Sequence, residues 1–164
     1  MGETCSVNVT IGISEMKVSN RPEDILVTYS LGSCVGVAVY DPVARVGGMV
    51  HCMLPLSKFD PARAEQKPAM FMDTGMGALI RAALDLGAQK QRLIVKVAGA
   101  AKFMDEQGTF RIGERNLTIL RKVLWKNNML IAAEEVGGTA ARTLYLYMDT
   151  GRTVVRSQGR KYEI

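Results

Sequence analysis

The sequence lacks long apolar runs, and none approaches the ~20 consecutive apolar residues of a membrane-spanning helix. Its first ten residues, MGETCSVNVT, lack the positively charged segment and following apolar stretch of a secretory signal. We therefore expect a cytoplasmic protein with no membrane insertion.

Histidine and cysteine are scarce. The chain has one histidine, His51, and its three cysteines are Cys5, Cys34 and Cys52, with no Cys-x-x-Cys spacing. An odd number of cysteines without a leader favours free thiols in a reducing compartment. One histidine cannot build the usual zinc ligand sets, so we expect no metal. The absence of a resolving cysteine also argues against a thiol redox protein.

Clustered charge is missing as well. Lys and Arg number 21 against 16 Asp and Glu, a formal net charge of +5, but the two signs are interspersed along the chain. No basic cluster or aromatic platform marks a nucleic-acid stripe, so we expect no nucleic-acid partner. The mildly basic balance is compatible with an acidic protein partner.

The composition is that of one ordinary globular domain. The 164 residues are 48% hydrophobic and 23% charged, without an internal repeat or low-complexity tract. A chain of this length buries roughly 70% of its unfolded surface, which is enough for a core. We expect a single domain over residues 1–164.

Hydrophobic periodicity predicts an α+β fold. Period-2 or short apolar runs indicate strands at 7–13, 23–28, 35–40, 45–54, 92–99, 129–136 and, as a hairpin, 144–156. Helical spacing follows Thr74 as a candidate N-cap, ends near Gly87, and recurs over 113–127. Residues 55–71, with three prolines, are predicted to be an irregular functional loop. The order favours helices packed on a mixed, largely antiparallel sheet.

The predicted hairpin brings a cysteine and the histidine together. If the turn is Asp41–Ala44, opposing residue numbers sum to 85 and Cys34 lies opposite His51, with Cβ atoms roughly 4.5–5.5 Å apart. Cys52 then lies on the other face. A slip of one residue would separate the pair, and Gly47–Gly48 is a possible position for a bulge.

This pairing has a catalytic and a structural interpretation. A protonated imidazole lowers the pKa of a neighbouring thiol from near ~8.5, and the histidine then serves as base and acid. Backbone N–H groups from Leu31 to Cys34, including those of Gly32 and Ser33, are candidate oxyanion donors. Alternatively, Cys34 is a small buried hydrophobe and His51 a core side chain. The inert core role fits Cys52 better.

Several segments resemble one family. The segments LGSCVGVAVYDPVARVGGMVHCMLP, MGALIRAALDLGA, RLIVKVAGAAKF, IGERNLTILRKVL and DTGRTVV resemble the CheD family, the chemoreceptor glutamine deamidases of bacterial and archaeal chemotaxis. The resemblance spans residues 20 to 156. Ala100 departs from it, because the family often has a second glycine there.

The resemblance implies both a fold and a chemistry. It implies a cysteine-hydrolase fold, a layered α/β sandwich with two to three helices. It also implies hydrolytic deamidation of receptor glutamines through a thioester on Cys34, with His51 and Thr28 completing a triad and no cofactor. The implied partner is the cytoplasmic helical region of chemoreceptors. The alternative is a non-catalytic module that docks receptor helices or a CheC-type phosphatase.

Overall fold

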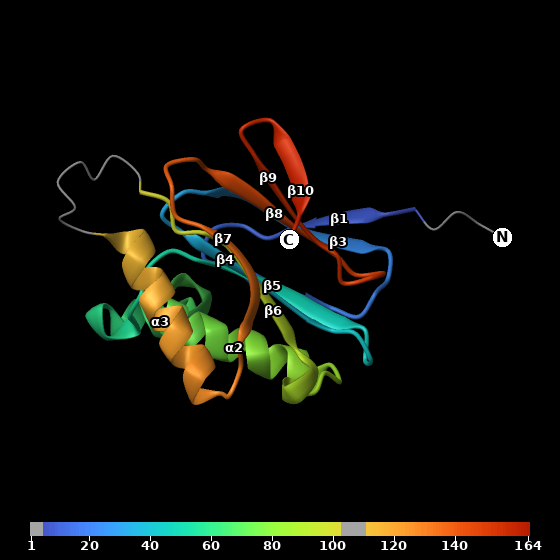
Figure 1. The fold of residues 1–164 in the computed structure, drawn as a ribbon. Helices are drawn as coiled ribbons and strands as arrows, with labels where there is room; N and C mark the ends of the chain where they lie inside the picture. Colours follow the sequence, from blue (N-terminus) through green and yellow to red (C-terminus); the bar gives the residue numbers. More distant parts are fainter. Residues whose placement is uncertain (1–4, 103–110) are drawn as a thin grey trace.

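Two β-sheets and a layer of helices are stacked on one another in the computed structural model, which describes residues 5–102 and 111–164 (Figure 1). The outer sheet carries the chain's C-terminal strands, and the central sheet lies between it and the helices. The predicted α+β class and the layered sandwich are confirmed, but the strands form two sheets where hydrophobic periodicity predicted one, because periodicity does not show which strands pair. Each sheet is mixed, with one parallel and three antiparallel strand pairs.

The outer sheet has the strand order β1-β3-β8-β9-β10. Its strands are β1 Val7–Thr10, β3 Asp24–Leu31, β8 Arg142–Tyr147, β9 Thr153–Ser157 and β10 Arg160–Glu163. The central sheet has the order β2-β5-β4-β6-β7. Its strands are β2 Met16–Ser19, β4 Val35–Asp41, β5 Val46–Cys52, β6 Ile94–Gly99 and β7 Ile131–Val136. Sequence patterning missed β2 and β10, because four residues are too few to show a period.

The helical layer covers one face of the central sheet. It consists of α1 Pro61–Gln66, α2 Met72–Asp85 and α3 Ile112–Lys126, with α2 and α3 in contact (Figure 1). The prediction that 55–71 is irregular is wrong, because Asp60 caps α1 by accepting from the Arg63 N–H and Pro61 occupies the first helical position. The second helix starts at Met72, two residues before the predicted cap.

Both faces of the central sheet are buried. In β4, the valines at 35, 37 and 39 pack against the helices, while the alternate residues Ala38 and Tyr40 face the outer sheet. Strands buried on two sides have continuous apolar runs rather than a polar alternation. This explains the sequences VGVAVY and VGGMVHC, and it places every residue of β5, His51 included, in the interior.

The register of the β4–β5 hairpin differs from the prediction by two residues. Asp41 pairs with Val46 and Gly36 with His51, so paired numbers sum to 87 and Cys34 is not directly opposite His51. The turn is displaced because the Asp41 carboxylate accepts from two turn N–H groups and Arg45 adopts a left-handed φ of 56°. No bulge interrupts the ladder at Gly47–Gly48.

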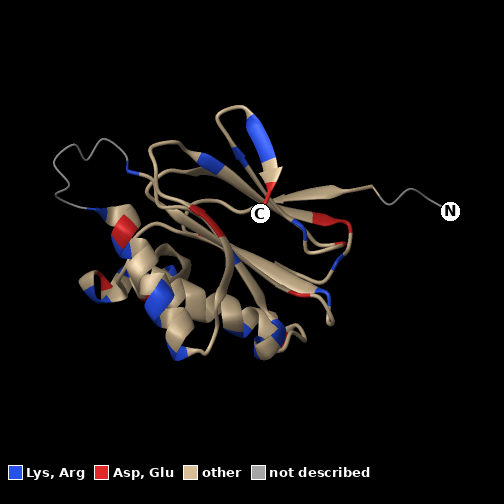
Figure 2. Ribbon diagram, viewed as in Figure 1, with Lys and Arg blue, Asp and Glu red and all other residues tan. Residues whose placement is uncertain are grey.

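Charge is distributed over the layers. Lys and Arg lie on the helices and on strands of the outer sheet, with Asp and Glu among them (Figure 2). The net positive charge is therefore not gathered on one element. Among the described helices, none is long and apolar enough to cross a membrane.

The hairpin turn is tied to the α2–β6 connection by a buried carboxylate. Asp41 has no exposed surface, and it accepts from the Gln89 N–H at 2.8 Å and from Arg92 Nε at 3.0 Å. Burial alone would raise the pKa of Asp41, but these bonds and those from the turn N–H groups outweigh it and lower the pKa to about 2.

We expect Asp41→Asn to lower the free energy of unfolding at neutral pH by about 2 kcal/mol. A depressed carboxyl pKa contributes stability above the unfolded value of 3.8, and this contribution is lost as the pH falls toward about 2. Urea unfolding at pH 7 and pH 2.5 measures both effects. Asp149→Asn, at an exposed position in the other hairpin, is the control. An equal loss of unfolding free energy in Asp41→Asn at both pH values would contradict a stabilising role for the ionised Asp41 carboxylate.

Candidate active site

Thr28 and His51 join the two sheets through a hydrogen bond. Thr28 lies on β3 in the outer sheet and His51 on β5 in the central sheet, and neither has exposed surface. The Thr28 Oγ1 atom is 2.6 Å from His51 Nδ1 and donates to the carbonyl of Ile11 at 2.7 Å. Ile11 lies in the connection that carries the chain from β1 to β2, between the two sheets.

These contacts determine which ring nitrogen of His51 carries the proton. A hydroxyl has one hydrogen, and that of Thr28 is donated to Ile11. The oxygen can therefore only accept from His51, which requires Nδ1 to be protonated and leaves Nε2 as a lone pair. Within the described chain, Nε2 is buried and has no hydrogen-bond partner. The imidazole is thus arranged as a base.

Cys34 lies at the point where the chain crosses from the outer to the central sheet. A register irregularity between Thr28 and Leu31 and a left-handed Ser30 lie in the last residues of β3, which ends at Leu31. Residues 32–34 then form a bend before β4. Because Cys34 is two residues before Gly36, it faces the same side as His51 and is its diagonal neighbour, a separation of about 7–8 Å. The two side chains share a face, but no hydrogen bond joins them in the described structure.

Cys52 lies on the other side of the central sheet, as predicted. Its side chain has no exposed surface and belongs to the core beneath α2, where a Cβ on Gly75 would be 2.9 Å from Cys52 Sγ. Burial raises the pKa of this thiol. Cys34 is instead only half-buried and Cys5 is exposed.

Burial keeps both Cys34 and His51 neutral. It raises the pKa of the Cys34 thiol and lowers the pKa of His51 to about 4. The expectation of a thiol pKa lowered by a protonated imidazole is therefore wrong for the free protein, because the imidazole is uncharged at neutral pH. A nucleophilic attack by Cys34 would therefore start from a neutral thiol and require its proton to move to a base.

The carbonyl groups of the bend at residues 32–34, which carries Cys34, all accept hydrogen bonds. The carbonyls of Gly32 and Cys34 accept from the backbone N–H groups of Ala101 and Ala100, at 2.8 and 2.9 Å. That of Ser33 accepts from the side chain of Asn116 at 3.1 Å. The Gly32 N–H donates to Ser30 O, whereas in the described structure the N–H groups of Ser33 and Cys34 donate to no backbone carbonyl. These two are the available oxyanion donors.

Close backbone packing holds the bend against β6 and α3. A Cβ on Gly99 would lie against the Cys34 carbonyl, and one on Gly113 would lie 2.8 Å from the Ala100 carbonyl carbon. Ala100 itself has a left-handed φ of 55°, a conformation that favours glycine. This explains physically why a glycine suits that position.

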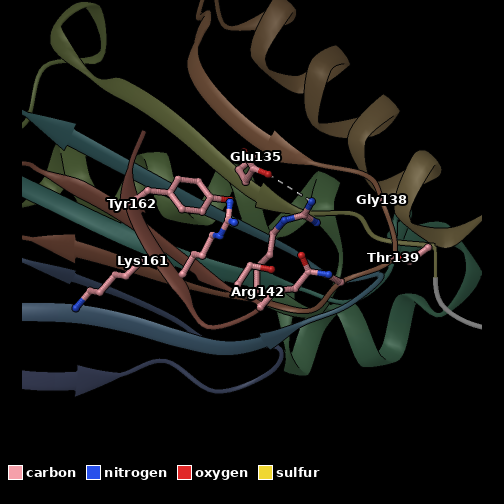
Figure 3. A pocket seen from close by; sticks show the side chains of 10 residues that line it. Glu135, Gly138, Thr139, Arg142, Lys161 and Tyr162 are labelled. Carbon is pink, nitrogen blue, oxygen red and sulfur yellow. Dashed lines mark ion pairs between the residues drawn. The ribbon is translucent and has the colours of Figure 1, made fainter.

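Arg142 supports the same region from a neighbouring pocket. The pocket of about 870 Å³ opens between the ends of β7, β8 and β10, and Arg142 extends across it toward Glu135, while Lys161 points away (Figure 3). Arg142 is 7% exposed and donates through Nη1 to the Gly99 carbonyl at 3.1 Å. Its Nη2 lies 3.6 Å from Glu135. Arg142 therefore holds the end of β6 on which the Cys34 carbonyl packs.

Sequence reasoning missed Asn116 and Arg142. Asn116 lies on the apolar stripe of α3, next to the buried Leu117, and a polar residue there is a detectable signal. Arg142 occupies an inward position of β8 before Leu144, where an apolar residue is expected from the alternation. Among the residues that the structure describes, no three His, Cys, Asp or Glu side chains could hold a metal ion.

Comparisons with known proteins agree on one family. A family model described as CheD chemotactic sensory transduction matches residues 53–157. A probable chemoreceptor glutamine deamidase CheD 1 of Syntrophus aciditrophicus is 49% identical, covering 93% of this chain and 95% of that protein. A probable chemoreceptor glutamine deamidase CheD of Solibacter usitatus is 46% identical, covering 95% and 92%.

A solved structure with some likeness is that of the DUF152-family protein NMB0706 of Neisseria meningitidis. It has a TM-score of 0.46 at 7% identity, covering 82% of this chain and 63% of that chain. Similarity at this level supports no conclusion about function.

We expect His51 to titrate near pH 4, below the ordinary 6.5, because its burial disfavours the imidazolium. His51 is the only histidine, so one imidazole signal followed by proton NMR against pH reports it without ambiguity. The unfolded chain binds this proton at higher pH than the folded chain, so the free energy of unfolding should fall as the pH drops from about 6.5 to about 4.

His51→Gln is the control, because it should remove that pH dependence of unfolding. A titration midpoint at or above 6.5 in the folded protein would overturn the neutral resting state.

Proposed function

This chain belongs to the CheD family, and we propose that it is a protein-glutamine glutaminase that hydrolyses glutamine side chains of chemoreceptors to glutamate. The observation that carries the proposal is the Thr28–His51 hydrogen bond, which leaves a buried, unpaired base on the face that Cys34 shares. The family model begins at residue 53, so these three residues precede the segment that it matches. The roles proposed for them therefore rest on the motif resemblance and on their geometry.

In the first half of the proposed reaction, the Cys34 sulfur attacks the carbon of the glutamine carboxamide. His51 Nε2 takes the thiol proton as the carbon–sulfur bond forms. The carbonyl oxygen becomes an oxyanion, which the N–H groups of Ser33 and Cys34 stabilise. His51 then returns the proton to the leaving nitrogen, ammonia departs, and a γ-glutamyl thioester remains on Cys34.

In the second half, the same histidine activates water. His51 Nε2 removes a proton from the water molecule as its oxygen attacks the thioester carbon. The tetrahedral intermediate uses the same oxyanion donors, and its collapse expels the Cys34 sulfur, which takes the proton from His51. The products are a glutamate side chain and free enzyme, and no metal or redox cofactor takes part in this scheme.

The neutral resting state suits this mechanism. A base whose pKa is about 4 stays unprotonated throughout the neutral range, so it is ready to accept the thiol proton. Thr28 keeps the proton on Nδ1 and accepts from the ring in both its neutral and its charged form, because its own hydrogen is committed to Ile11. Thr28 is thus the orienting member of the triad.

The proposed setting is the cytoplasm, and the proposed substrate is the cytoplasmic helical region of chemoreceptors. The competing function is a module that binds receptor helices or a CheC-type phosphatase without chemistry. Receptor binding is compatible with both the hydrolase and the docking module, so turnover is the measurement that distinguishes them. Deamidation in isotopically labelled water, mapped by mass spectrometry of a receptor cytoplasmic fragment, gives glutamates that carry one solvent oxygen if the chain is the hydrolase.

We expect Cys34→Ala to abolish this conversion, since no other side chain supplies the nucleophile, while receptor binding persists. Cys52→Ala is the matched control and should keep most of the activity, because Cys52 lies on the helical side of the central sheet. Mass spectrometry of the receptor fragment and circular dichroism of each variant make the comparison. Equal activity in wild type and Cys34→Ala would contradict the assignment of Cys34 as the nucleophile. Receptor binding by the wild type without any conversion of glutamine would favour the docking module.

We expect Thr28→Val to lower kcat by about 10²-fold, in the range that general acid–base catalysis contributes. Valine keeps the shape of threonine but can neither accept from His51 nor donate to Ile11. The ring nitrogen shifts of His51 should show that the Nδ1-protonated form is no longer dominant. Thr143→Val, on the neighbouring strand β8, is the control. A Thr28→Val enzyme with unchanged kcat would make Thr28 a purely structural residue.

A further inference from the structure

We propose that Asn116 is a positioning residue that directs the Cys34 N–H toward the oxyanion of the reaction. The inference rests on the proposed deamidase function and adds to it a side chain from α3, far along the chain from Cys34, His51 and Thr28.

Asn116 is buried at the junction of α3 with the bend. It has no exposed surface, and its neighbours along the same helix face are Gly113, which packs on Ala100, and the core residue Leu120. The helix therefore approaches the bend closely enough for a short side chain to reach its backbone. An apolar residue would satisfy the packing of this stripe, so the amide calls for another explanation.

The Asn116 amide bridges the two strands at the position of the nucleophile. Its Nδ2 donates to the carbonyl of Ser33 at 3.1 Å and to that of Met53 at 3.2 Å. Two carbonyl acceptors require the NH₂ end of the amide, so the orientation of the side chain is unambiguous. Met53 is the residue opposite Cys34 when the register of the ladder is extended by one pair.

The bond to Ser33 sets the direction of the Cys34 N–H, because both groups belong to one peptide unit. The described residues contain no cis peptide bond, so this unit is trans and its C=O and N–H point in opposite directions. With its carbonyl held toward α3, its N–H points toward the opposite side of the central sheet. That is the side on which the Cys34 side chain packs.

Among the described residues, Asn116 is the side chain that donates to a carbonyl of the bend at residues 32–34. The carbonyls of Gly32 and Cys34 accept from the backbone N–H groups of Ala101 and Ala100, which do not depend on the identity of a side chain unless it is proline. The Ser33 carbonyl instead depends on Asn116. Without that bond the peptide plane is free to rotate, and an oxyanion donor that must reorient during the reaction loses the advantage of being preorganised. A donated bond at the carbonyl also polarises the peptide and strengthens its N–H as a donor.

The other end of the amide supports a role beyond stability. Asn116 Oδ1 is buried and has no partner among the described residues, and an unsatisfied buried acceptor of this kind destabilises the fold. If Asn116 served stability alone, we would expect both its Nδ2 and its Oδ1 to be hydrogen-bonded, or an apolar residue to occupy the position. Asn116 therefore has an unfavourable buried Oδ1, while its Nδ2 holds two carbonyls beside the proposed nucleophile.

The test compares two reactions of Cys34, only one of which forms an oxyanion. Deamidation of a receptor cytoplasmic fragment needs the Cys34 N–H, whereas alkylation of Cys34 by iodoacetamide is a displacement in which no oxyanion develops. In Asn116→Ala we expect kcat for deamidation to fall at least ~10-fold, and up to the ~10²–10³-fold that loss of an oxyanion donor costs, with KM unchanged. The rate of Cys34 alkylation and its pH profile should stay at the wild-type values.

Two further variants complete the design. Asn127→Ala removes a comparable amide from the end of the same helix, where it only caps the Val123 carbonyl, and should leave both reactions unchanged. Asn116→Gln keeps the NH₂ donor on a longer side chain and should recover part of kcat. If circular dichroism shows that Asn116→Ala does not fold, the test moves to Asn116→Gln. In that variant kcat for deamidation should fall by a smaller factor, while the rate of Cys34 alkylation stays at the wild-type value.

Each outcome is decisive. If the wild type converts no glutamine, the proposed deamidase function fails. If the wild type is active and the folded Asn116 variants keep its kcat, or lose deamidation and alkylation in equal proportion, then Asn116 has no positioning role and this inference fails alone.

Discussion

The site depends on one hydroxyl group, that of Thr28. It donates its only hydrogen to the Ile11 carbonyl and therefore can only accept from His51, which places the proton on Nδ1 and leaves Nε2 as a buried base. The bond also joins the two sheets, because Thr28 and His51 come from different layers. A carboxylate in this position would hold a charge within the apolar space between the sheets, whereas a hydroxyl orients the ring without one. The low histidine pKa follows from the same uncharged surroundings.

The rest of the structure brings the neutral thiol of Cys34 to the face of the sheet that His51 occupies, without forming an ion pair. The crossover from β3 to β4 carries Cys34 to the edge of the buried layer, and Gly99 lets β6 pack directly on its carbonyl. Burial holds the thiol protonated and the imidazole neutral, so the free protein keeps a relatively unreactive cysteine. In the proposed mechanism, activation of Cys34 depends on a substrate carbonyl whose developing negative charge is stabilised by the N–H groups of Ser33 and Cys34. All three carbonyls of the bend accept hydrogen bonds, whereas in the described structure the N–H groups of Ser33 and Cys34 donate to no backbone carbonyl.

The β4–β5 hairpin shows which features of the fold could be predicted from the sequence pattern and which could not. The two strands, their pairing and the shared face of Cys34 and His51 were predictable, because an error of two residues in register preserves the face. The register itself was not predictable, since it depends on how the Asp41 carboxylate and a left-handed Arg45 close the turn. Likewise, α1 and the short strands β2 and β10 carry too few residues for a period to emerge, and their formation depends on packing neighbours.

By itself, the sequence determined the α+β class, the free thiols, the candidate residues Cys34 and His51 and, through the CheD resemblance, Thr28 as their third member. It did so because hydrophobic periodicity and short motifs are local properties of the chain. Only the tertiary structure decided the tautomer of His51, the neutral state of the thiol and the hydrogen bonds of Asn116 on which its proposed role rests. Each of these depends on burial or on a hydrogen bond between residues distant in the chain, such as Thr28 with Ile11 and Asn116 with Ser33. No local pattern encodes the direction of a peptide plane.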